Sequence, residues 1–179
     1  MKTEIATLGT GCFWCTEAIF KQLKGVHQVT SGYSGGHLEN PDYKSVCSGE
    51  TGHAECLQIQ YDTDIITFEE LLEIFWKVHD PTSLNRQGED VGTQYRSVIF
   101  YHNETQLSIS RSYIEQLEAE HTFDKPIVTT LEPMKIFYPA EDYHQDYFRI
   151  NGDKNPYCQI VVRPKVEKFK KLFSDKLIS

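Results

Sequence analysis

Hydrophobic and polar residues follow two different periods along the chain, and these periods predict strands and helices in mixed order. Short apolar or alternating runs predict strands over residues 4–8, 26–30, 55–61, 95–101 and 127–131, with a further candidate at 159–162. Apolar residues at helical spacing predict helices over 13–24, 68–79 and 103–120, a short helix near 142–150 and a last helix over 165–177.

Several of these elements carry their own start and stop signals. Thr67 and Glu70 have the spacing of a capping box, in which the hydroxyl and the carboxylate bond to free backbone N–H groups. Asn103 is predicted to cap the long helix, and Gly25 to end the first one. The glycines between residues 32 and 36 predict a loop after the second strand.

The order of the elements predicts an α+β fold, because helices separate some of the strands and loops separate others. We expect a two-layer sandwich of a mixed β-sheet with packed helices, a ferredoxin-like core with elaborations, and a partly irregular C-terminal segment. No repeat or linker rich in Pro, Gly and Ser interrupts the pattern, so one domain over residues 1–179 is expected.

Composition and charge narrow the classes of function. The 10 Phe, 10 Tyr and 2 Trp exclude a disordered polymer. A net charge of −8, from 18 basic and 26 acidic residues, argues against a general affinity for nucleic acid or anionic membranes. No apolar run approaches the roughly 20 residues of a membrane span, and the first eight residues lack the layout of a secretory signal. We therefore expect a cytoplasmic protein.

The cysteines point to thiol chemistry. They lie at positions 12, 15, 47, 56 and 158, an odd and unevenly spaced set that is not a disulfide framework. Nothing in the sequence around Cys47 or Cys56 suggests activation, so both are expected to be buried structural thiols.

Cys12 has the sequence context of a nucleophile. It follows Gly11 and directly precedes a predicted helix, whose first turn offers unpaired N–H groups and a partial positive charge. Both stabilise a thiolate, which is the reactive form of cysteine. Phe13 and Trp14 add aromatic surface beside the sulfur, a suitable wall for an apolar ligand. The alternative is a buried cysteine that only fills space.

The spacing of Cys12 and Cys15 also fits a local disulfide or half of a zinc site. His53 and Cys56 offer a second half-site. However, residues three apart on a strand point to opposite faces, and Cys56 lies in an alternating run. We therefore expect neither a metal nor a cofactor, with a zinc-stabilised binding module as the alternative.

Five motifs, in order along the chain, resemble the A-type peptide methionine sulfoxide reductases. They are GCFWC at 11–15, NPDYKSVCSGETGHAE at 40–55, HDPTSLNRQGEDVGTQYRS at 79–97, FYPAEDYHQDY at 137–147 and NPYC at 155–158. The resemblance covers essentially the whole chain. It implies a thiol-dependent reduction of methionine-S-sulfoxide, free or in proteins, to methionine, and so the repair of oxidised proteins. A thioredoxin-like disulfide oxidoreductase using Cys12 and Cys15 is the competing interpretation.

The resemblance also implies roles for individual residues. A thiolate that attacks a sulfoxide sulfur needs an acid nearby, because the oxygen leaves poorly unless it is protonated. Glu55 matches that acid. Tyr43 and Tyr95 match phenols that donate hydrogen bonds to the oxygen as negative charge develops on it.

The same resemblance implies a binding pocket. Phe13 and Trp14 match aromatic residues that hold the substrate methyl group, a polarisable apolar group. Asp90 matches a residue that helps to hold the water and hydrogen-bond network of the site. His144 and Tyr147 match residues that line the site from the C-terminal side, although His144 could also be a surface histidine. His53 is expected to be a structural hydrogen-bonding residue.

A second cysteine must resolve the sulfenic acid that the family forms. Cys158 matches the first C-terminal cysteine of the family, and we expect it to react first with Cys12. Cys15 stands where many relatives have a small residue, one helical turn from Cys12, and is the alternative or a second relay. The resulting disulfide would be reduced by thioredoxin through thiol–disulfide exchange. We expect a monomer.

Overall fold

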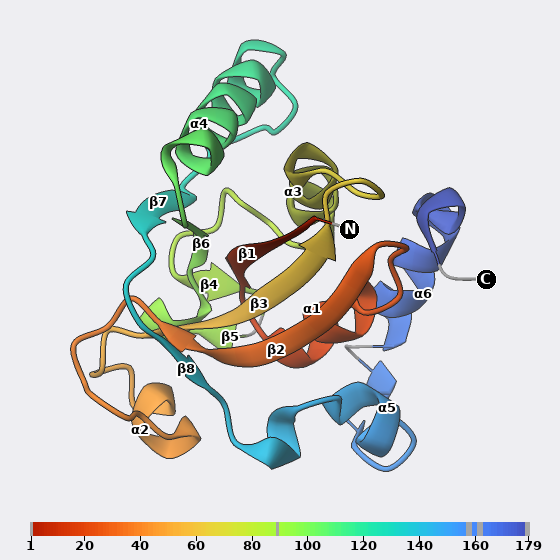
Figure 1. Cartoon of the computed structure of the whole chain (residues 1–179). Helices are drawn as coiled ribbons and strands as arrows, with labels where there is room; N and C mark the ends of the chain where they lie inside the picture. Colours follow the sequence, from red (N-terminus) through yellow and green to blue (C-terminus); the bar gives the residue numbers. More distant parts are fainter. Residues whose placement is uncertain (1, 89, 157–158, 161–162, 178–179) are drawn as a thin grey trace.

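The computed structural model describes residues 2–88, 90–156, 159–160 and 163–177 (Figure 1). The strands are β1 (Thr3–Thr10), β2 (Val26–Ser34), β3 (Ala54–Asp62), β4 (Arg86–Gln87), β5 (Asp90–Val91), β6 (Ser97–Tyr101), β7 (Thr130–Pro133) and β8 (Phe137–Pro139). The α-helices are α1 (Phe13–Phe20), α2 (Tyr43–Cys47), α3 (Phe68–Val78), α4 (Glu104–Ala119), α5 (Tyr147–Asn151) and α6 (Arg163–Leu172). Short 3-10 turns include η1 (Thr93–Tyr95), η2 (Asp142–His144) and η4 (Ser174–Lys176).

The main sheet has the strand order β7-β6-β1-β3-β2-β8. All neighbouring pairs are antiparallel except β6 and β7, which are parallel, so the sheet is mixed as predicted. The succession β1-α1-β2-β3-α3-β6, with β3 between β1 and β2, is the split βαβ arrangement of ferredoxin-like folds. The predicted α+β class is therefore confirmed.

The helices close the core against this sheet. One cluster of buried side chains joins Leu8 and Ile59 on the strands to Phe20 of α1, Phe75 of α3 and Phe169 of α6. In Figure 1, α6 lies beside α1, while α4 lies at the β7 edge of the sheet. Within the described ranges, no helix combines the length and the apolarity that a membrane crossing requires.

The helix caps follow the sequence signals. Thr67 Oγ1 accepts a hydrogen bond of 3.1 Å from the Glu70 N–H, and Glu70 Oε1 accepts one of 3.2 Å from the Thr67 N–H. Asn103 Oδ1 accepts a hydrogen bond of 2.9 Å from the Gln106 N–H at the start of α4. Both predicted caps are thus confirmed.

The predicted loop over 32–36 is wrong for its first three residues, because β2 continues to Ser34. This stretch pairs with β3 on one side and with the edge strand β8 on the other. The partner strand explains the glycine: a Cβ at Gly32 would lie 2.3 Å from the Phe137 ring and 2.5 Å from the Tyr138 carbonyl oxygen. A glycine that admits a neighbouring strand looks like a loop signal in the sequence alone.

Other boundaries differ as well. The strand predicted over 95–101 begins at Ser97, after η1, and the one over 127–131 runs over Thr130–Pro133. The candidate strand at 159–162 is wrong for residues 159 and 160, the part that the structure describes. There the Gln159 N–H donates a hydrogen bond of 3.1 Å to the Asn155 carbonyl oxygen, as in a helical turn.

Three predicted helices are shorter or divided. The helix over 13–24 ends at Phe20, and the last helix ends at Leu172 before the separate turn η4. The helix near 142–150 is divided into η2 and α5 because Asp146 between them has a left-handed φ of 58°.

Candidate active site

Cys12 lies at the junction between β1 and α1. Gly11 has a φ of +96°, which favours glycine, and lets the chain turn sharply at the end of the strand. Cys12 is then the N-cap of α1, half-buried and with an extended backbone (φ −61°, ψ 118°). Cys12 therefore stands at the N-terminal end of α1, where the positive end of the helix dipole favours a thiolate.

A cavity of about 180 Å³ opens at this junction. Six of the residues predicted for the site line it: Cys12, Trp14, Tyr43, Glu55, Asp90 and Tyr95. They come from segments widely separated in the sequence, namely α1 and its N-cap, α2, β3, β5 and η1. The fold thus brings the predicted nucleophile, acid and phenols to one small cavity.

Glu55 forms a buried wall of the cavity, with only 2% of its surface exposed. It lies on β3 opposite Tyr33 of β2, and its Oε1 accepts a hydrogen bond of 3.4 Å from the Phe13 N–H. Burial, together with the negative charges of Cys12 and Asp90, raises the pKa of Glu55 well above its ordinary value, against the effect of the Phe13 N–H. The carboxyl group is thereby suited to hold and deliver a proton.

Tyr43 and Tyr95 line the same cavity from α2 and η1. Tyr43 is the first residue of α2, whose cap Asp42 accepts a hydrogen bond of 2.8 Å from the Ser45 N–H. Burial first, and then the charge of Glu55, raises the pKa of both phenols. Both hydroxyls therefore remain protonated hydrogen-bond donors at neutral pH.

Glu141 holds Tyr43 in place, and sequence reasoning did not single it out. Its Oε2 accepts a hydrogen bond of 2.9 Å from the Tyr43 N–H, and its Oε1 accepts one of 3.0 Å from the Tyr33 hydroxyl. Glu141 stands within the fourth motif, but nothing in the local sequence indicates that its side chain contacts residues 98 and 108 positions away.

The hairpin of β4 and β5 holds Asp90 over the cavity. Arg86 pairs with Val91 and Gln87 with Asp90. The Gln87 side chain ties the hairpin to the end of α3, since its Oε1 accepts from the Asp80 N–H at 2.9 Å and its Nε2 donates to the Asp80 carbonyl at 2.6 Å. Two-residue strands carry no hydrophobic period, so the sequence did not reveal this hairpin.

Trp14 is held by the segment between β8 and α5. Its ring stacks on Tyr147 with centroids 3.9 Å apart and an interplanar angle of 8°, and its Nε1 donates to His144 Nδ1 at 3.0 Å. His144 is 1% exposed, so its interpretation as a surface histidine is wrong. Burial lowers the pKa of His144, which favours the neutral ring that can accept from Trp14.

Phe13 and Tyr147 lie behind the cavity rather than on it. The Phe13 ring is buried and packs between Tyr33 and His144, with centroid distances of 5.8 Å and 5.3 Å. Of the predicted aromatic pair, Trp14 lines the cavity, while Phe13 contributes its backbone N–H to Glu55.

The remaining cysteines differ in their environments. Cys56 is buried, as predicted. Cys47 is exposed, so the prediction that it is a buried thiol is wrong. Cys47 ends the short helix α2, and its thiol lies within hydrogen-bonding reach of the Tyr43 and Tyr95 hydroxyls. Cys158 lies outside the described residues, and Cys15 is described only as part of α1.

His53 has the structural role that its sequence context suggested. Its Nδ1 accepts a hydrogen bond of 3.0 Å from the Gly36 N–H, and its Nε2 lies 2.7 Å from the Leu38 carbonyl oxygen. Both ring nitrogens are therefore occupied by the backbone. Among the side chains that the structure describes, no group of three or more His, Cys, Asp and Glu residues could hold a metal ion.

Comparison with known proteins finds a family model described as "Peptide methionine sulfoxide reductase" that matches residues 4–177. The chain is 57% identical to "Peptide methionine sulfoxide reductase MsrA" of Saccharolobus solfataricus, over 97% of each chain. It is also 57% identical to a protein of the same name from Chromobacterium violaceum, over 96% of this chain and 97% of the other.

Solved structures agree with these matches. Mxr1 from Saccharomyces cerevisiae in its reduced form is similar with a TM-score of 0.81 and 38% identity, over 88% of this chain and 90% of that one. Mxr1 in complex with Trx2 is similar with a TM-score of 0.58 and 30% identity, over 82% of this chain and 85% of that one.

Proposed function

The chain belongs to the peptide methionine sulfoxide reductase family, and on this premise we propose that Cys12 reduces methionine-S-sulfoxide, free or in proteins, to methionine. The observation that supports this assignment most strongly is the cavity that places a helix-capping cysteine, a buried carboxyl group and two phenols together. In one site it supplies a nucleophile, a proton and hydrogen bonds for the oxygen. The enzyme is an oxidoreductase of the MsrA type.

The first step transfers oxygen from substrate to enzyme. The Cys12 thiolate attacks the sulfoxide sulfur while Glu55 delivers a proton to the sulfoxide oxygen. Tyr43 and Tyr95 donate hydrogen bonds to that oxygen as negative charge grows on it. The oxygen then moves to the Cys12 sulfur, while the sulfur–oxygen bond of the substrate and the new sulfur–sulfur bond break, so that methionine leaves and Cys12 carries the protonated oxygen as a sulfenic acid.

Trp14 provides the apolar wall for the methyl group on the substrate sulfur, and His144 and Tyr147 hold the Trp14 ring from behind. Asp90 faces the cavity and helps to hold the hydrogen-bond network around the reacting oxygen. A pocket of about 180 Å³ fits the end of one side chain rather than a large ligand. The site is thus suited to a methionine sulfoxide presented at a protein surface.

The second step forms a disulfide. A second thiol attacks the sulfenic sulfur of Cys12, releasing water, and we propose Cys158 as that thiol, with Cys15 as the alternative or a second relay. Thioredoxin then reduces the disulfide. The structure of Mxr1 in complex with Trx2 supports this choice of partner.

The assignment is tested by turnover of the two separated epimers of methionine sulfoxide, with thioredoxin as reductant. We expect the wild-type chain to reduce the S epimer, and Cys12→Ser to lose the reaction while remaining folded. Cys56→Ser serves as the control, because Cys56 is buried and is not among the residues that line the cavity. Turnover of an insulin-type disulfide but not of either epimer would instead identify a disulfide oxidoreductase.

The resolving cysteine is tested by peptide mapping after one equivalent of sulfoxide, without reductant. A crosslink between Cys12 and Cys158 supports the proposed order. If only the crosslink between Cys12 and Cys15 forms, and Cys158→Ser turns over normally with thioredoxin, the order is wrong and Cys15 resolves.

A further inference from the structure

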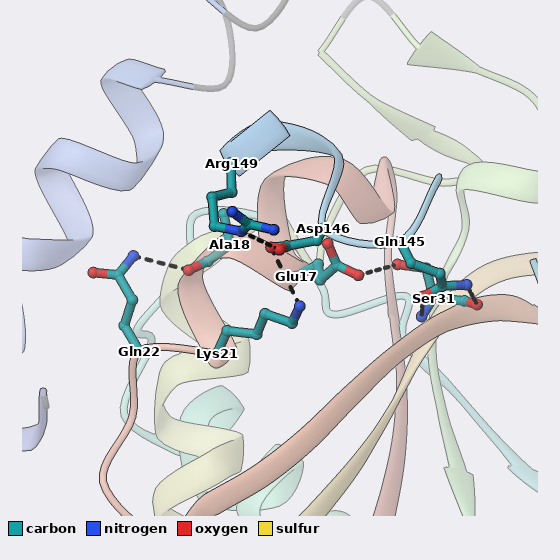
Figure 2. A network of polar contacts seen from close by, with 8 residues as sticks. All are labelled: Glu17, Ala18, Lys21, Gln22, Ser31, Gln145, Asp146 and Arg149. Atoms are coloured by element: carbon teal, nitrogen blue, oxygen red, sulfur yellow. Dashed lines mark hydrogen bonds and ion pairs between the residues drawn. The ribbon is translucent and has the colours of Figure 1, made fainter. Parts of the chain in front are cut away.

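A polar cluster links α1, β2 and the segment before α5, outside the cavity (Figure 2). At its centre is Glu17, three residues after Trp14 on α1 and only 1% exposed. Its Oε2 accepts a hydrogen bond of 3.1 Å from the Ser31 hydroxyl on β2. Its carboxylate also accepts one from the backbone N–H of Asp146. Glu17 thus joins three elements through one buried carboxyl group.

Gln145 adds a second attachment between the same segment and β2. Its Oε1 accepts a hydrogen bond of 2.9 Å from the Ser31 N–H, and its Nε2 donates to the Ser31 carbonyl at 2.9 Å and to the Ala140 carbonyl at 3.0 Å. The side chain therefore binds the edge of β2 just beyond the last paired residue of β8. Ser31 is bound through its side chain by Glu17 and through its backbone by Gln145.

Asp146 is held in an unusual backbone conformation. Its φ of 58° and ψ of 31° are left-handed, a conformation that is unfavourable for most residues, although aspartate tolerates it better than others. Its carboxylate pairs with Lys21 at 3.2 Å and with Arg149. Its N–H, turned toward α1, is satisfied by Glu17. These contacts with Lys21, Arg149 and Glu17 therefore stabilise a left-handed conformation of Asp146 that is unfavourable by itself.

The outer two residues of the segment 144–147 and the inner two make different contacts. His144 and Tyr147 touch Trp14, by a hydrogen bond of 3.0 Å and a ring stack at 3.9 Å. Gln145 and Asp146, between them, touch the polar cluster. The two residues that hold the wall of the cavity are thus placed by the two residues that bind Ser31 and Glu17.

We propose that Glu17 is a positioning residue for sulfoxide binding: through Ser31 and the Asp146 N–H, it holds residues 144–147 against Trp14. The inference rests on the proposed function, because the ring of Trp14 is the wall assigned to the substrate methyl group. Without the carboxylate, the Asp146 N–H and the Ser31 hydroxyl lose a buried partner, and the left-handed turn loses a contact that fixes it. His144 and Tyr147 then hold Trp14 less firmly.

The proposal is tested with Glu17→Ala, and with Glu17→Gln as the conservative variant, whose amide oxygen can still accept from one of the two donors. Glu115→Ala, an exposed glutamate on α4, is the control. A Trp76→Phe background leaves Trp14 as the only tryptophan, so that its fluorescence reports its surroundings. The measurements are KM and kcat for methionine sulfoxide, Trp14 emission, and amide hydrogen exchange over residues 142–151.

We expect Glu17→Ala to raise KM about tenfold, as for the loss of a hydrogen bond to a charged group, with a smaller change in kcat. Trp14 emission should shift, and exchange over 142–151 should become faster. Glu17→Gln should recover most of each change, and Glu115→Ala should change none. If Glu17→Ala does not fold, Ser31→Ala takes its place. This variant removes only one of the two donors to Glu17 and should give smaller changes in KM, Trp14 emission and hydrogen exchange, in the same direction.

Unchanged KM, emission and exchange in Glu17→Ala, or in Ser31→Ala if only that variant folds, would overturn the positioning role. Trp14 emission and hydrogen exchange are measured without any turnover. They therefore test the positioning role of Glu17 even if the wild-type chain reduces no sulfoxide. Failure of wild-type turnover would instead contradict the proposed function. The two failures are therefore distinguishable.

Discussion

The backbone N–H of Phe13 donates a hydrogen bond of 3.4 Å to Oε1 of Glu55, which couples the first residue of α1 to the buried carboxyl group on β3. Because Phe13 directly follows Cys12, this contact places the proposed acid and the proposed nucleophile against one another. The negative charge of Cys12 is in turn one of the causes, after burial, that raise the pKa of Glu55. The nucleophile therefore affects the pKa of the acid as well as lying beside it.

This coupling predicts how the rate of the first step depends on pH. The protonated form of Glu55 is the donor, so the single-turnover rate should fall as pH rises through its elevated pKa. Glu55→Gln can donate a hydrogen bond but not a proton, and should be slower by about 10²–10⁴-fold without that descending limb. Stopped-flow measurement of methionine formation between pH 6 and 8 tests this. A Glu55→Gln variant that reacts as fast as the wild-type chain over that interval would remove Glu55 from the mechanism.

The same substitution should make the fold more stable at neutral pH. The pKa of Glu55 is higher in the folded chain than in the unfolded chain, so on raising the pH Glu55 ionises first in the unfolded chain. The free energy of unfolding therefore falls as pH rises from about 4.5 to the pKa of the folded state. Glu55→Gln removes that cost, and each pKa unit corresponds to about 1.4 kcal/mol. Chemical denaturation at pH 8 and at pH 4 should show a higher free energy of unfolding for Glu55→Gln than for the wild-type chain at pH 8 only. A loss of stability at pH 8 contradicts the raised pKa.

The two phenols should act on the rate more than on binding. Tyr43→Phe and Tyr95→Phe each remove one donor to the developing oxyanion, which typically costs about 10²–10³-fold in kcat. Tyr101→Phe on β6 is the matched control, because Tyr101 does not line the cavity. Steady-state kinetics with free methionine sulfoxide decide the matter. Equal kcat values in the three variants would exclude the phenols from the reaction.

Trp14 should determine binding of the methyl group. Trp14→Leu removes the stacked ring and the donor to His144, and should raise KM several-fold, as expected for the loss of buried aromatic surface. Trp76→Phe, in the core of α3, is the control for the loss of a tryptophan. Kinetics with methyl and ethyl sulfoxides test the prediction: the wild-type preference for methyl should weaken in Trp14→Leu. An unchanged preference would place the methyl group elsewhere.

Local signals in the sequence were enough to predict much of the architecture. The capping box at Thr67 and Glu70 and the alternating run of β3 depend on contacts within a few residues, and both appear in the structure. The α+β class follows from the order of such elements. The continuation of β2 through Gly32 depends instead on β8, which is more than 100 residues away in the chain, and a glycine carries no local sign of that partner.

The same distinction holds for the site. Cys12 could be found from its place between a glycine and a helix, and the family motifs supplied Glu55, Tyr43 and Tyr95 as candidates that the fold brings to one cavity. Glu141 and the polar cluster around Glu17 could not be found in this way. Their partners come from distant segments, and the sequence does not tell which acidic residues become buried.

The measurement that tests the central claim most directly is a single turnover with one equivalent of methionine-S-sulfoxide and no reductant. The account predicts that each chain of a Cys15→Ser, Cys158→Ser variant releases one methionine and retains one oxygen on Cys12, detected by mass spectrometry after trapping with a sulfenic-acid reagent. Release of methionine by Cys12→Ser, or its release from the double variant with the trapped oxygen on another cysteine, would contradict it.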